Sequence, residues 1–539
     1  MYPFALTASY CPAVVDGPLE DMTVGEALRR AAADSPARPA LTEITAAGVA
    51  GRRWTFGALL ADAEALARVL LTRHAPGARI AIWAPNVPEW VLLELAAGLA
   101  GITIVTINPS FQPREVHFVL AQSQASALYL VPSHRGNPMR QIAESLAPEL
   151  PGLETIVDLA DREALYRPAG PLPGGALPAV DPLAVAQIQY TSGTTGFPKG
   201  ALLHHRGITN NARLHAARIG GRAGDTWLNF MPLFHTGGCA VQVLGALQTR
   251  GHLVLAAQFD AGLMIDAIER ERVNLVLGVP TMIRGMLEMN ARQPRDLTSV
   301  HTVIVGGAMV PPELVTKTRE VFGCDFQIIY GQTETSPVLT CVWKDDSLDD
   351  ITGTVGQAIP HTELSIRDPK TNETVPIGGI GEICARGYCT MHGYNDNPAA
   401  TRAALDEQGW LHTGDLGTMD ARGYVRVTGR LKEMIIRGGE NLFPAEIENA
   451  MLEHPAIADC AVVGLPDPTW GEVVACFIRP AGHERPGMQE LAAFCRERLS
   501  PQKTPARWIF VETWPTTASG KIQKFALQEG FARGEYEAL

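Results

Sequence analysis

One loop near the middle of the chain combines residue types that bind phosphate groups. It follows an apolar segment and reads Tyr190-Thr191-Ser192-Gly193-Thr194-Thr195-Gly196-Phe197-Pro198-Lys199-Gly200. Its hydroxyl groups, glycine N–H groups and lysine can converge on phosphate oxygens, so the loop predicts a triphosphate site. It is not a Walker A loop, because no Ser or Thr follows Lys199 to hold magnesium. A flexible linker is the alternative interpretation, but a linker does not require the Pro-Lys-Gly ending.

The segments around this loop alternate between helical and β-branched patterns, which is typical of α/β proteins. Helices are expected at 21–35 and 56–73, and strands at 253–257, 273–279, 300–305 and 326–329. The last three strands end at polar or Gly/Pro-containing loops, where open α/β sheets bind ligands. We therefore expect the active site on those loops. Residues 151–181 are rich in Pro, Gly and Ala and predict a surface connection.

Composition and charge exclude several classes of protein. At 539 residues and 46% hydrophobic content, the chain is too long for one ordinary domain. A formal net charge of -12 argues against a basic surface that holds nucleic acid or an anionic membrane, although a local basic groove for phosphates stays open. The nine cysteines lack the spacing of a zinc site, so we expect reduced thiols in a cytoplasmic protein.

Neither the N-terminus nor the longest apolar stretch has the features of a membrane or secretion segment. Residues 1–17 lack the basic start and apolar core of a signal peptide. Residues 90–107 are interrupted by Glu94, Gly98 and Gly101, which favours an amphipathic helix running into a buried strand. No transmembrane segment is expected.

A series of further motifs follows the phosphate loop in order. They are Phe234-His235-Thr236-Gly237-Gly238, Tyr330-Gly331-Gln332-Thr333-Glu334, Gly381-Glu382-Ile383, Trp410-Leu411-His412-Thr413-Gly414-Asp415, Gly429-Arg430-Leu431-Lys432-Glu433, Gly438-Gly439-Glu440-Asn441 and Ser519-Gly520-Lys521-Ile522. With the loop, the ordered set resembles the signatures of the adenylate-forming superfamily, which includes acyl-CoA synthetases, the adenylation domains of peptide synthetases and firefly luciferase. The resemblance covers about Tyr190 to Lys524, with a weaker similarity toward the N-terminus.

The resemblance implies an ATP site with magnesium. Glu334 is expected to hold Mg²⁺, a hard cation that suits a carboxylate, and Thr333 to donate its hydroxyl to the α-phosphate. Tyr330 offers an aromatic face to adenine. The remaining nucleotide contacts are expected from the phosphate loop (Thr191, Ser192, Gly193, Thr194, Thr195 and Lys199), from the glycine-rich backbone at Gly307 and Ala308, from Asp415 at the ribose, and from Arg430 at the ribose or phosphate.

The resemblance also implies that one site carries out two half-reactions. Lys521 is expected to stabilise the negative charge that develops when the carboxylate attacks the α-phosphate and pyrophosphate leaves. Lys432 occupies the position of a hinge that rotates a small domain before coenzyme A reacts. Gly438 and Gly439 are expected to line the path of the thiol, because glycine lets a narrow tunnel pass close to the backbone.

The sequence says less about which acid is the substrate. His235 stands where amino-acid-activating domains usually carry an Asp, which disfavours an amino acid, and Ile329 stands where many aryl-CoA ligases have Gly. His235 is expected at the carboxylate end of the acyl pocket. The Thr333 to Pro337 segment resembles the medium- and long-chain fatty acyl branch, with bulky alicyclic, terpenoid and aryl acids as alternatives. An acyl-AMP ligase that loads a carrier protein, a non-catalytic nucleotide sensor and an oxygen-dependent light emitter are the other candidates.

The predicted architecture is therefore an α/β protein of two domains. A large multi-layer α/β domain at 1–430 is expected to bind ATP and the acid, and a small mobile α+β domain at 431–539 to carry Lys521. Expected ligands are ATP, Mg²⁺, coenzyme A and a small carboxylic acid, with no nucleic acid partner. A homo-oligomer stays open.

Overall fold

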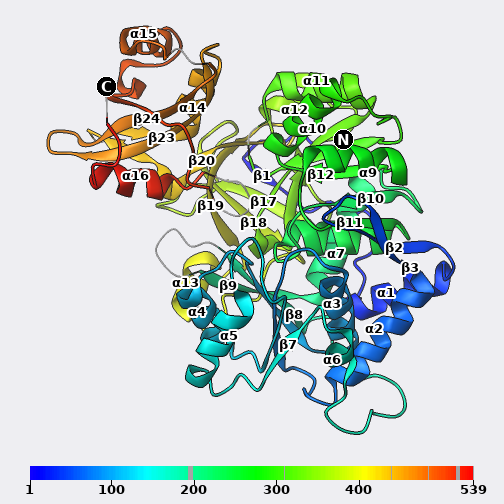
Figure 1. The fold of residues 1–539 in the computed structure, drawn as a ribbon. Helices are drawn as coiled ribbons and strands as arrows, with labels where there is room; N and C mark the ends of the chain where they lie inside the picture. Colours follow the sequence, from blue (N-terminus) through cyan, green and yellow to red (C-terminus); the bar gives the residue numbers. More distant parts are fainter. Residues whose placement is uncertain (192–197, 309, 439, 483–484, 517–521, 538–539) are drawn as a thin grey trace. The chain divides into compact units, whose positions relative to one another are not determined.

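The computed structural model describes residues 1–191, 198–308, 310–438, 440–482, 485–516 and 522–537 (Figure 1). The chain divides into two compact units. The large unit comprises Met1–Pro3, Cys11–Leu364 and Ala385–His412, and the small unit comprises Phe4–Tyr10, Ser365–Cys384 and Thr413–Leu539. The predicted domain boundary at residue 430 stays a prediction.

A six-stranded sheet in the large unit carries the predicted phosphate loop at its edge. Its order is β7-β6-β4-β5-β8-β9, and only β8 and β9 pair in antiparallel fashion. The strands are β4 (Arg79–Trp83), β5 (Thr103–Ile107), β6 (Ala127–Leu130), β7 (Thr155–Asp158), β8 (Val185–Thr191) and β9 (Lys199–His204). Buried Trp83, Leu128 and Ile188 belong to the apolar core packed on this sheet.

A nine-stranded sheet has the order β16-β15-β14-β13-β12-β10-β11-β2-β3, with a parallel centre and antiparallel edges. Its strands are β2 (Pro39–Ile44), β3 (Ala50–Thr55), β10 (Thr226–Asn229), β11 (His252–Ala256), β12 (Leu275–Gly278), β13 (Thr302–Gly306), β14 (Asp325–Gly331), β15 (Val338–Cys341) and β16 (Gln357–Ala358). All four predicted strands are confirmed as β11 to β14, because short β-branched runs fit a buried parallel sheet.

Helices connect these strands. The α-helices of the large unit are α1 (Val24–Asp34), α2 (Phe56–Leu70), α3 (Pro88–Ala100), α4 (Pro113–Ser123), α5 (Met139–Leu146), α6 (Arg162–Tyr166), α7 (His205–Arg218), α8 (Gly245–Gln248), α9 (Ala261–Glu271), α10 (Pro280–Arg292), α11 (Pro312–Phe322), α12 (Leu348–Gly353) and α13 (Pro398–Ala404). The 3₁₀ turns η1 (Ala147–Glu149) and η3 (Thr333–Thr335) and the π-helix η2 (Gly237–Leu244) complete the set. The two predicted helices are α1 and α2, which begin after Thr23 and Thr55 because each hydroxyl accepts a backbone N–H of the first turn.

Two predictions about these segments were wrong in part: residues 90–107 do contain a helix followed by the buried strand β5, and most of 167–181 is exposed, but the details differ. The helix predicted to be amphipathic within 90–107 is α3, and all thirteen of its residues are buried, including Glu94. The polar residue Glu94 therefore does not lie on a solvent-exposed face of the helix, because Gln187 supplies a buried hydrogen-bond partner for it. The predicted surface connection at 151–181 contains β7 and α6, since Thr155–Asp158 adds a parallel strand next to β6.

The remaining strands form two sheets. The first has the order β1-β17-β18-β19-β20, from β1 (Tyr10–Cys11), β17 (Thr362–Arg367), β18 (Gly381–Gly387), β19 (Leu411–Met419) and β20 (Val425–Arg430). The second has the order β22-β21-β24-β23, with β25 on β24, from β21 (Ile435–Arg437), β22 (Glu440–Leu442), β23 (Ile457–Asp467), β24 (Gly471–Pro480) and β25 (Arg507–Phe510).

The second sheet has an apolar core on each face, because successive residues of a strand point to opposite sides. Val462 packs in one core and Val463 in the other. The helical elements of this region are α14 (Pro444–Leu452), α15 (Met488–Arg498), α16 (Lys524–Ala532), η4 (Leu431–Glu433) and η5 (Pro501–Lys503). The predicted fold class, a large α/β part with a smaller α+β part, is confirmed.

All nine cysteines are buried and lie outside disulfides, in line with the expected thiols. Among the described residues, no helix combines the length and the hydropathy that a membrane span requires.

Candidate active site

The predicted phosphate loop connects two paired strands. Tyr190 lies opposite Gly200 and Thr191 opposite Lys199 in the β8–β9 register. The Thr191 hydroxyl donates to the Lys199 carbonyl at 3.3 Å. Gly200 leaves no room for a side chain, since a Cβ there would lie 2.7 Å from Ile188. The hairpin therefore fixes both ends of the loop. Four predicted loop residues, Ser192, Gly193, Thr194 and Thr195, lie outside the described residues.

Two of the predicted functional side chains meet at a third that the sequence analysis missed. The Lys199 ammonium lies over the ring of Tyr394, 4.9 Å from its centroid. The Tyr394 hydroxyl donates to Glu334 Oε1 at 2.8 Å. We call these three residues the Lys199–Tyr394–Glu334 corner. No local pattern around Tyr394 indicates this role, because both of its partners are far away in the sequence.

Backbone hydrogen bonds hold the segment that carries Tyr394. Residues 391–395 run beside β9, where His392 N donates to Leu202 O at 2.9 Å and Asn395 N donates to Gly200 O at 2.7 Å. Met391 N also donates to the carbonyl of Glu334 at 2.9 Å. The segment thus ties the strand after the phosphate loop to the turn that carries Glu334.

That turn is the 3₁₀ element η3, and both predicted residues in it are buried. Glu334 is 9% exposed and Thr333 is 8% exposed. The Thr335 hydroxyl donates to the carbonyl oxygens of Gln332 and Pro337, each at 2.8 Å. A carboxylate this poorly hydrated is costly unless it is hydrogen-bonded or faces a cation. Tyr394 satisfies one oxygen, and the other suits a hard cation such as Mg²⁺.

The residues predicted to hold adenine lie on neighbouring parallel strands. Gly306 of β13 pairs with Ile329 of β14, so Gly307 and Tyr330 follow at the same level of the sheet. Gly307 has φ +81, and both it and Ala308 are exposed. A Cβ on Gly306 would lie 2.8 Å from the Ile329 side chain. Ile329 therefore fills the space above Gly306.

His235 is half-buried in the turn before the π-helix η2. Its Nδ1 accepts the backbone N–H of Gly237 at 3.1 Å, which places the proton of the neutral ring on Nε2. Gly238 is packed against the Pro232 carbonyl, so a side chain there is excluded. π-Helical turns occur often at functional sites. The turn is therefore a fixed support for the His235 ring.

Asn86 is a second residue that the sequence analysis missed. It is buried, and its amide donates to the carbonyls of Met231 and Ala256 at 3.0 and 3.1 Å. Its carbonyl accepts the N–H of Leu233 at 2.9 Å. Asn86 thereby ties the segment before His235 to the end of β11. A lone Asn between two elements gives no signal of such a role in the sequence.

A buried polar network connects the strand before the phosphate loop to η2. Gln187 donates to Glu94 at 2.7 Å, and Gln189 donates to Gln187 at 2.8 Å and to Cys239 Sγ at 3.2 Å. Burial raises the pKa of Glu94 well above its ordinary value, against the opposing effect of the Gln187 hydrogen bond. A neutral Glu94 can therefore remain in this core.

In the small unit, the two residues predicted at the ribose form an ion pair. Asp415 of β19 lies opposite Arg430 of β20, and Arg430 Nε lies 3.1 Å from Asp415 Oδ1. The Thr413 hydroxyl donates to the Ile383 carbonyl at 2.7 Å and accepts the N–H of Asp415 at 3.1 Å. This arrangement holds Asp415 at a fixed position on its strand.

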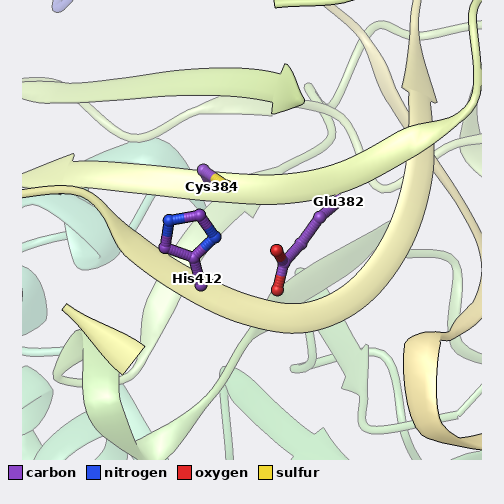
Figure 2. Close-up of side chains that lie close together, drawn as sticks. All are labelled: Glu382, Cys384 and His412. Carbon is purple, nitrogen blue, oxygen red and sulfur yellow. The ribbon is translucent and has the colours of Figure 1, made fainter. Parts of the chain in front are cut away.

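Three potential metal ligands gather on the neighbouring strands β18 and β19. Figure 2 shows Glu382, Cys384 and His412, whose ligand atoms lie within 4.8 Å of one another. Glu382 accepts the N–H of Gly414 at 2.9 Å, and His412 Nε2 lies 3.7 Å from an oxygen of Asp406. Because protein groups already partner these side chains, we interpret the cluster as structural support for residues 413–415 of β19.

The predicted hinge lies in a short exposed turn. Lys432 is exposed within the 3₁₀ element η4. Its neighbour Glu433 lies 3.0 Å from the ammonium of Lys524, which also lies 2.8 Å from Glu448. Burial alone lowers the pKa of Lys524, but the two carboxylates outweigh it, and the pKa is raised.

Gly438, predicted to line the thiol path, has φ +58 and donates its N–H to the Trp470 carbonyl at 2.8 Å. A Cβ there would lie 2.9 Å from the Trp470 ring, so glycine suits this turn for two reasons. Gly439 and Lys521 lie outside the described residues.

An α/β unit with a buried acid near the β8–β9 hairpin, together with an α+β unit, agrees with the fold of adenylate-forming enzymes. The AMP-binding enzyme family pattern matches residues 28–395, and the AMP-binding enzyme C-terminal domain pattern matches residues 446–521. The chain therefore belongs to the AMP-binding enzyme family, and within it is an AMP-forming acid–CoA ligase.

Relatives and solved structures agree with this assignment. YngI of Bacillus subtilis is 38% identical over 84% of the chain and 87% of its own length. The mitochondrial medium-chain acyl-CoA ligase ACSF2 of Rattus norvegicus is 34% identical over 97% and 89%. ATP-bound MatB of Rhodopseudomonas palustris has a TM-score of 0.85 at 27% identity, covering 95% of this chain and 99% of MatB. Bacillus subtilis o-succinylbenzoate CoA synthetase in complex with its acyl-adenylate has a TM-score of 0.82 at 28% identity, covering 95% and 99%.

Proposed function

We propose that the protein joins a hydrophobic carboxylic acid to coenzyme A at the expense of ATP, with AMP and pyrophosphate as the other products. The observation that carries this proposal is the Lys199–Tyr394–Glu334 corner, which places a cation and a buried acid next to the phosphate-loop hairpin. An ammonium suits phosphate oxygens, and a carboxylate suits a divalent cation.

In the first half-reaction, a carboxylate oxygen of the acid attacks the α-phosphorus of ATP, and the bond to pyrophosphate breaks. Lys199 and the phosphate loop bind the β- and γ-phosphates, and the Thr333 hydroxyl donates to the α-phosphate. Glu334 fits Mg²⁺, because its carboxylate is buried and Tyr394 occupies only one oxygen. A bound Mg²⁺ supplies positive charge to the phosphates.

The contacts proposed for the nucleoside are assigned residue by residue. Tyr330 stacks on adenine, and Gly307 and Ala308 offer exposed backbone at the same level of the sheet. Asp415 accepts the ribose hydroxyls, while Arg430 fixes its carboxylate by the ion pair. Lys521 stabilises the charge on the carboxylate and α-phosphate during attack.

In the second half-reaction, the thiol of coenzyme A attacks the acyl carbon and AMP leaves. Lys521 must leave the carboxylate to open this path, so the predicted small domain, residues 431–539, turns about Lys432. The exposure of Lys432 in a three-residue turn supports this role. Gly438 and Gly439 then line the thiol path, and His235 shapes the carboxylate end of the acyl pocket.

A medium- or long-chain fatty acid is the proposed substrate. Ile329 fills the space above Gly306 and narrows the room for a flat ring. Relatives named medium-chain acyl-CoA ligase support this choice. Bulky alicyclic, terpenoid and aryl acids are the alternatives, and the last is favoured by the similarity to an anthranilate CoA ligase with a TM-score of 0.84. The nine free thiols support a cytoplasmic location.

The test is a thioester assay over a panel of acids with ATP, MgCl₂ and coenzyme A. The panel contains straight-chain acids of increasing length, cyclohexane carboxylic acid, a terpenoid acid, benzoate and anthranilate. The proposal expects thioester formation to peak with a straight-chain acid. A peak with an aryl acid would replace the substrate class and leave the reaction intact.

A second assay identifies the acceptor. Purified acyl carrier protein in its phosphopantetheinyl form is offered beside free coenzyme A at equal concentration. Thioester on coenzyme A supports the proposal. Transfer to the carrier protein alone would make the chain an acyl-AMP ligase that loads carriers.

A further inference from the structure

Tyr394 stands between a positive and a negative side chain. The Lys199 ammonium lies on one face of its ring, and its hydroxyl donates to Glu334. Among the described residues, Lys199 and Glu334 form no ion pair with each other. Glu334 is buried and Lys199 is half-buried, so their opposite charges attract each other more strongly than they would in bulk water, and their separation needs a physical cause.

Tyr394 supplies that cause, because both of its interactions are made by a neutral group. The ring face attracts a cation without neutralising it. The phenol orients a carboxylate through a charge-assisted hydrogen bond and leaves the negative charge in place. Lys199 thus keeps its charge for phosphate, and Glu334 keeps its charge for a divalent cation.

The surroundings hold the ring in this position. Backbone hydrogen bonds fix residues 391–395 beside β9, and Asn395 also donates its side-chain amide to the Gln122 carbonyl at 3.0 Å. The Met391 N–H binds the backbone carbonyl of Glu334. The same short segment therefore fixes Tyr394, the strand that begins at Lys199 and the turn that carries Glu334.

We propose that Tyr394 is a positioning residue that keeps Lys199 and Glu334 apart, so that each binds its own part of magnesium–ATP. This inference rests on the proposed function for the identity of the ligand. Without the ring, Lys199 and Glu334 pair with each other, and both are lost to the ligand. Without only the hydroxyl, Glu334 loses its orientation but the two charges stay apart.

The two effects are separated by three variants. Tyr394→Phe removes the hydroxyl, Tyr394→Ala also removes the ring, and Tyr394→Ala with Lys199→Met removes the ring and the competing cation. Tyr388→Phe is the matched control: it is a buried tyrosine shortly before Tyr394, and its hydroxyl accepts from Asn211 at 3.4 Å.

The primary readout is the Mg²⁺ concentration that gives half-maximal binding of ATP to the protein, measured by calorimetry without the acid or coenzyme A. Loss of a group that orients a metal ligand weakens metal affinity by about 10- to 100-fold, so Tyr394→Phe raises this concentration about 10-fold. Tyr394→Ala raises it further. Lys199→Met alone, which costs ATP its Lys199 contact, is the reference for the double variant, and in that background Tyr394→Ala adds no more than about the Tyr394→Phe effect. Tyr388→Phe matches the wild type.

The spacer role is overturned if Tyr394→Ala raises the Mg²⁺ requirement as far in the Lys199→Met background as in the wild type. The orienting role is overturned if Tyr394→Phe binds Mg²⁺ and ATP like the wild type. If Tyr394→Ala does not fold, the Tyr394→Phe result alone tests the proposal. Because binding is measured without the acid, these outcomes are distinct from failure of the proposed reaction, which appears as absent thioester in the wild type.

Discussion

The Lys199–Tyr394–Glu334 corner and the turn at Lys432 are built in opposite ways. In the corner, a buried carboxylate is held by a phenol and by backbone hydrogen bonds from residues 391–395. The turn is a single 3₁₀ element with an exposed lysine. Groups that hold the same ligand throughout a reaction gain from being fixed, and a hinge needs few contacts that resist a backbone change. The difference supports the two proposals, that the corner binds the ligand and that the turn at Lys432 is the hinge.

The largest expected effect is at the corner. Glu334→Gln keeps an oxygen for the Tyr394 hydroxyl but removes the charge, so acid-dependent pyrophosphate exchange should fall by about 10²- to 10³-fold, as for other losses of transition-state charge stabilisation. Thioester formation from isolated acyl-adenylate should change little. Normal exchange at saturating Mg²⁺ would remove Glu334 from the metal role.

The next largest effect is expected at the turn that contains Lys432, where the second half-reaction should be lost and the first retained. Lys432→Pro fixes φ and removes an N–H, so single-turnover thioester formation from acyl-adenylate should fall at least about tenfold while pyrophosphate exchange is retained. Lys432→Ala, which leaves the backbone free, is the control. Equal losses in both steps, or none in either, would contradict the hinge assignment.

A smaller effect is expected at the ion pairs of Lys524 with Glu433 and Glu448, which lie next to the Lys432 turn. Lys524→Met leaves Glu433 and Glu448 without their shared cation and should destabilise the protein by about 1–3 kcal/mol in guanidinium unfolding, less than a fully buried pair would lose. Lys317→Met, which breaks an exposed pair with Glu320, should cost less than about 1 kcal/mol.

The sign of the pH dependence follows from the raised pKa of Lys524. The stabilisation is fully present below the ordinary lysine value of 10.5 and is lost as pH rises through the higher folded value. The difference between wild type and Lys524→Met should therefore be constant from neutral pH up to that value. A difference that vanishes near pH 7 would contradict the ion-pair interpretation.

The smallest effect concerns acid stability of the large unit. Burial lowers the pKa of His215 to about 3, and within the described chain neither ring nitrogen has a hydrogen-bond partner. The folded state thus disfavours the charged ring, and stability present above the ordinary value of 6.5 is lost as pH falls toward 3.

His215→Leu removes this contribution. Between pH 6.5 and 5, wild type should lose about 1–2 kcal/mol more than the variant, seen as a steeper fall in Tm. His117→Leu, at a half-exposed site on α4, is the control and should follow the wild type. Parallel Tm curves for wild type and His215→Leu would contradict the burial argument.

The sequence predicted the parts of this molecule that local patterns determine. Strands β11 to β14 could be predicted because short β-branched runs fit a buried sheet. Helices α1 and α2 could be predicted because a threonine precedes each helical pattern of apolar residues. The burial of α3 could not be predicted from local patterns, since it depends on a hydrogen bond from Gln187, on another element, to Glu94. Asn86 and Tyr394 were missed for the same reason, because their roles lie in long-range hydrogen bonds.

The most direct test of the account separates the two half-reactions in the wild-type protein. Acid, ATP and MgCl₂ are supplied first without coenzyme A, and exchange of pyrophosphate into ATP is measured. Coenzyme A is then added, and AMP and thioester are quantified. The account predicts exchange that requires the acid but not coenzyme A, followed by AMP and thioester in equal amounts. ADP and phosphate as products, or exchange that starts only after coenzyme A is added, would contradict an acyl-adenylate route.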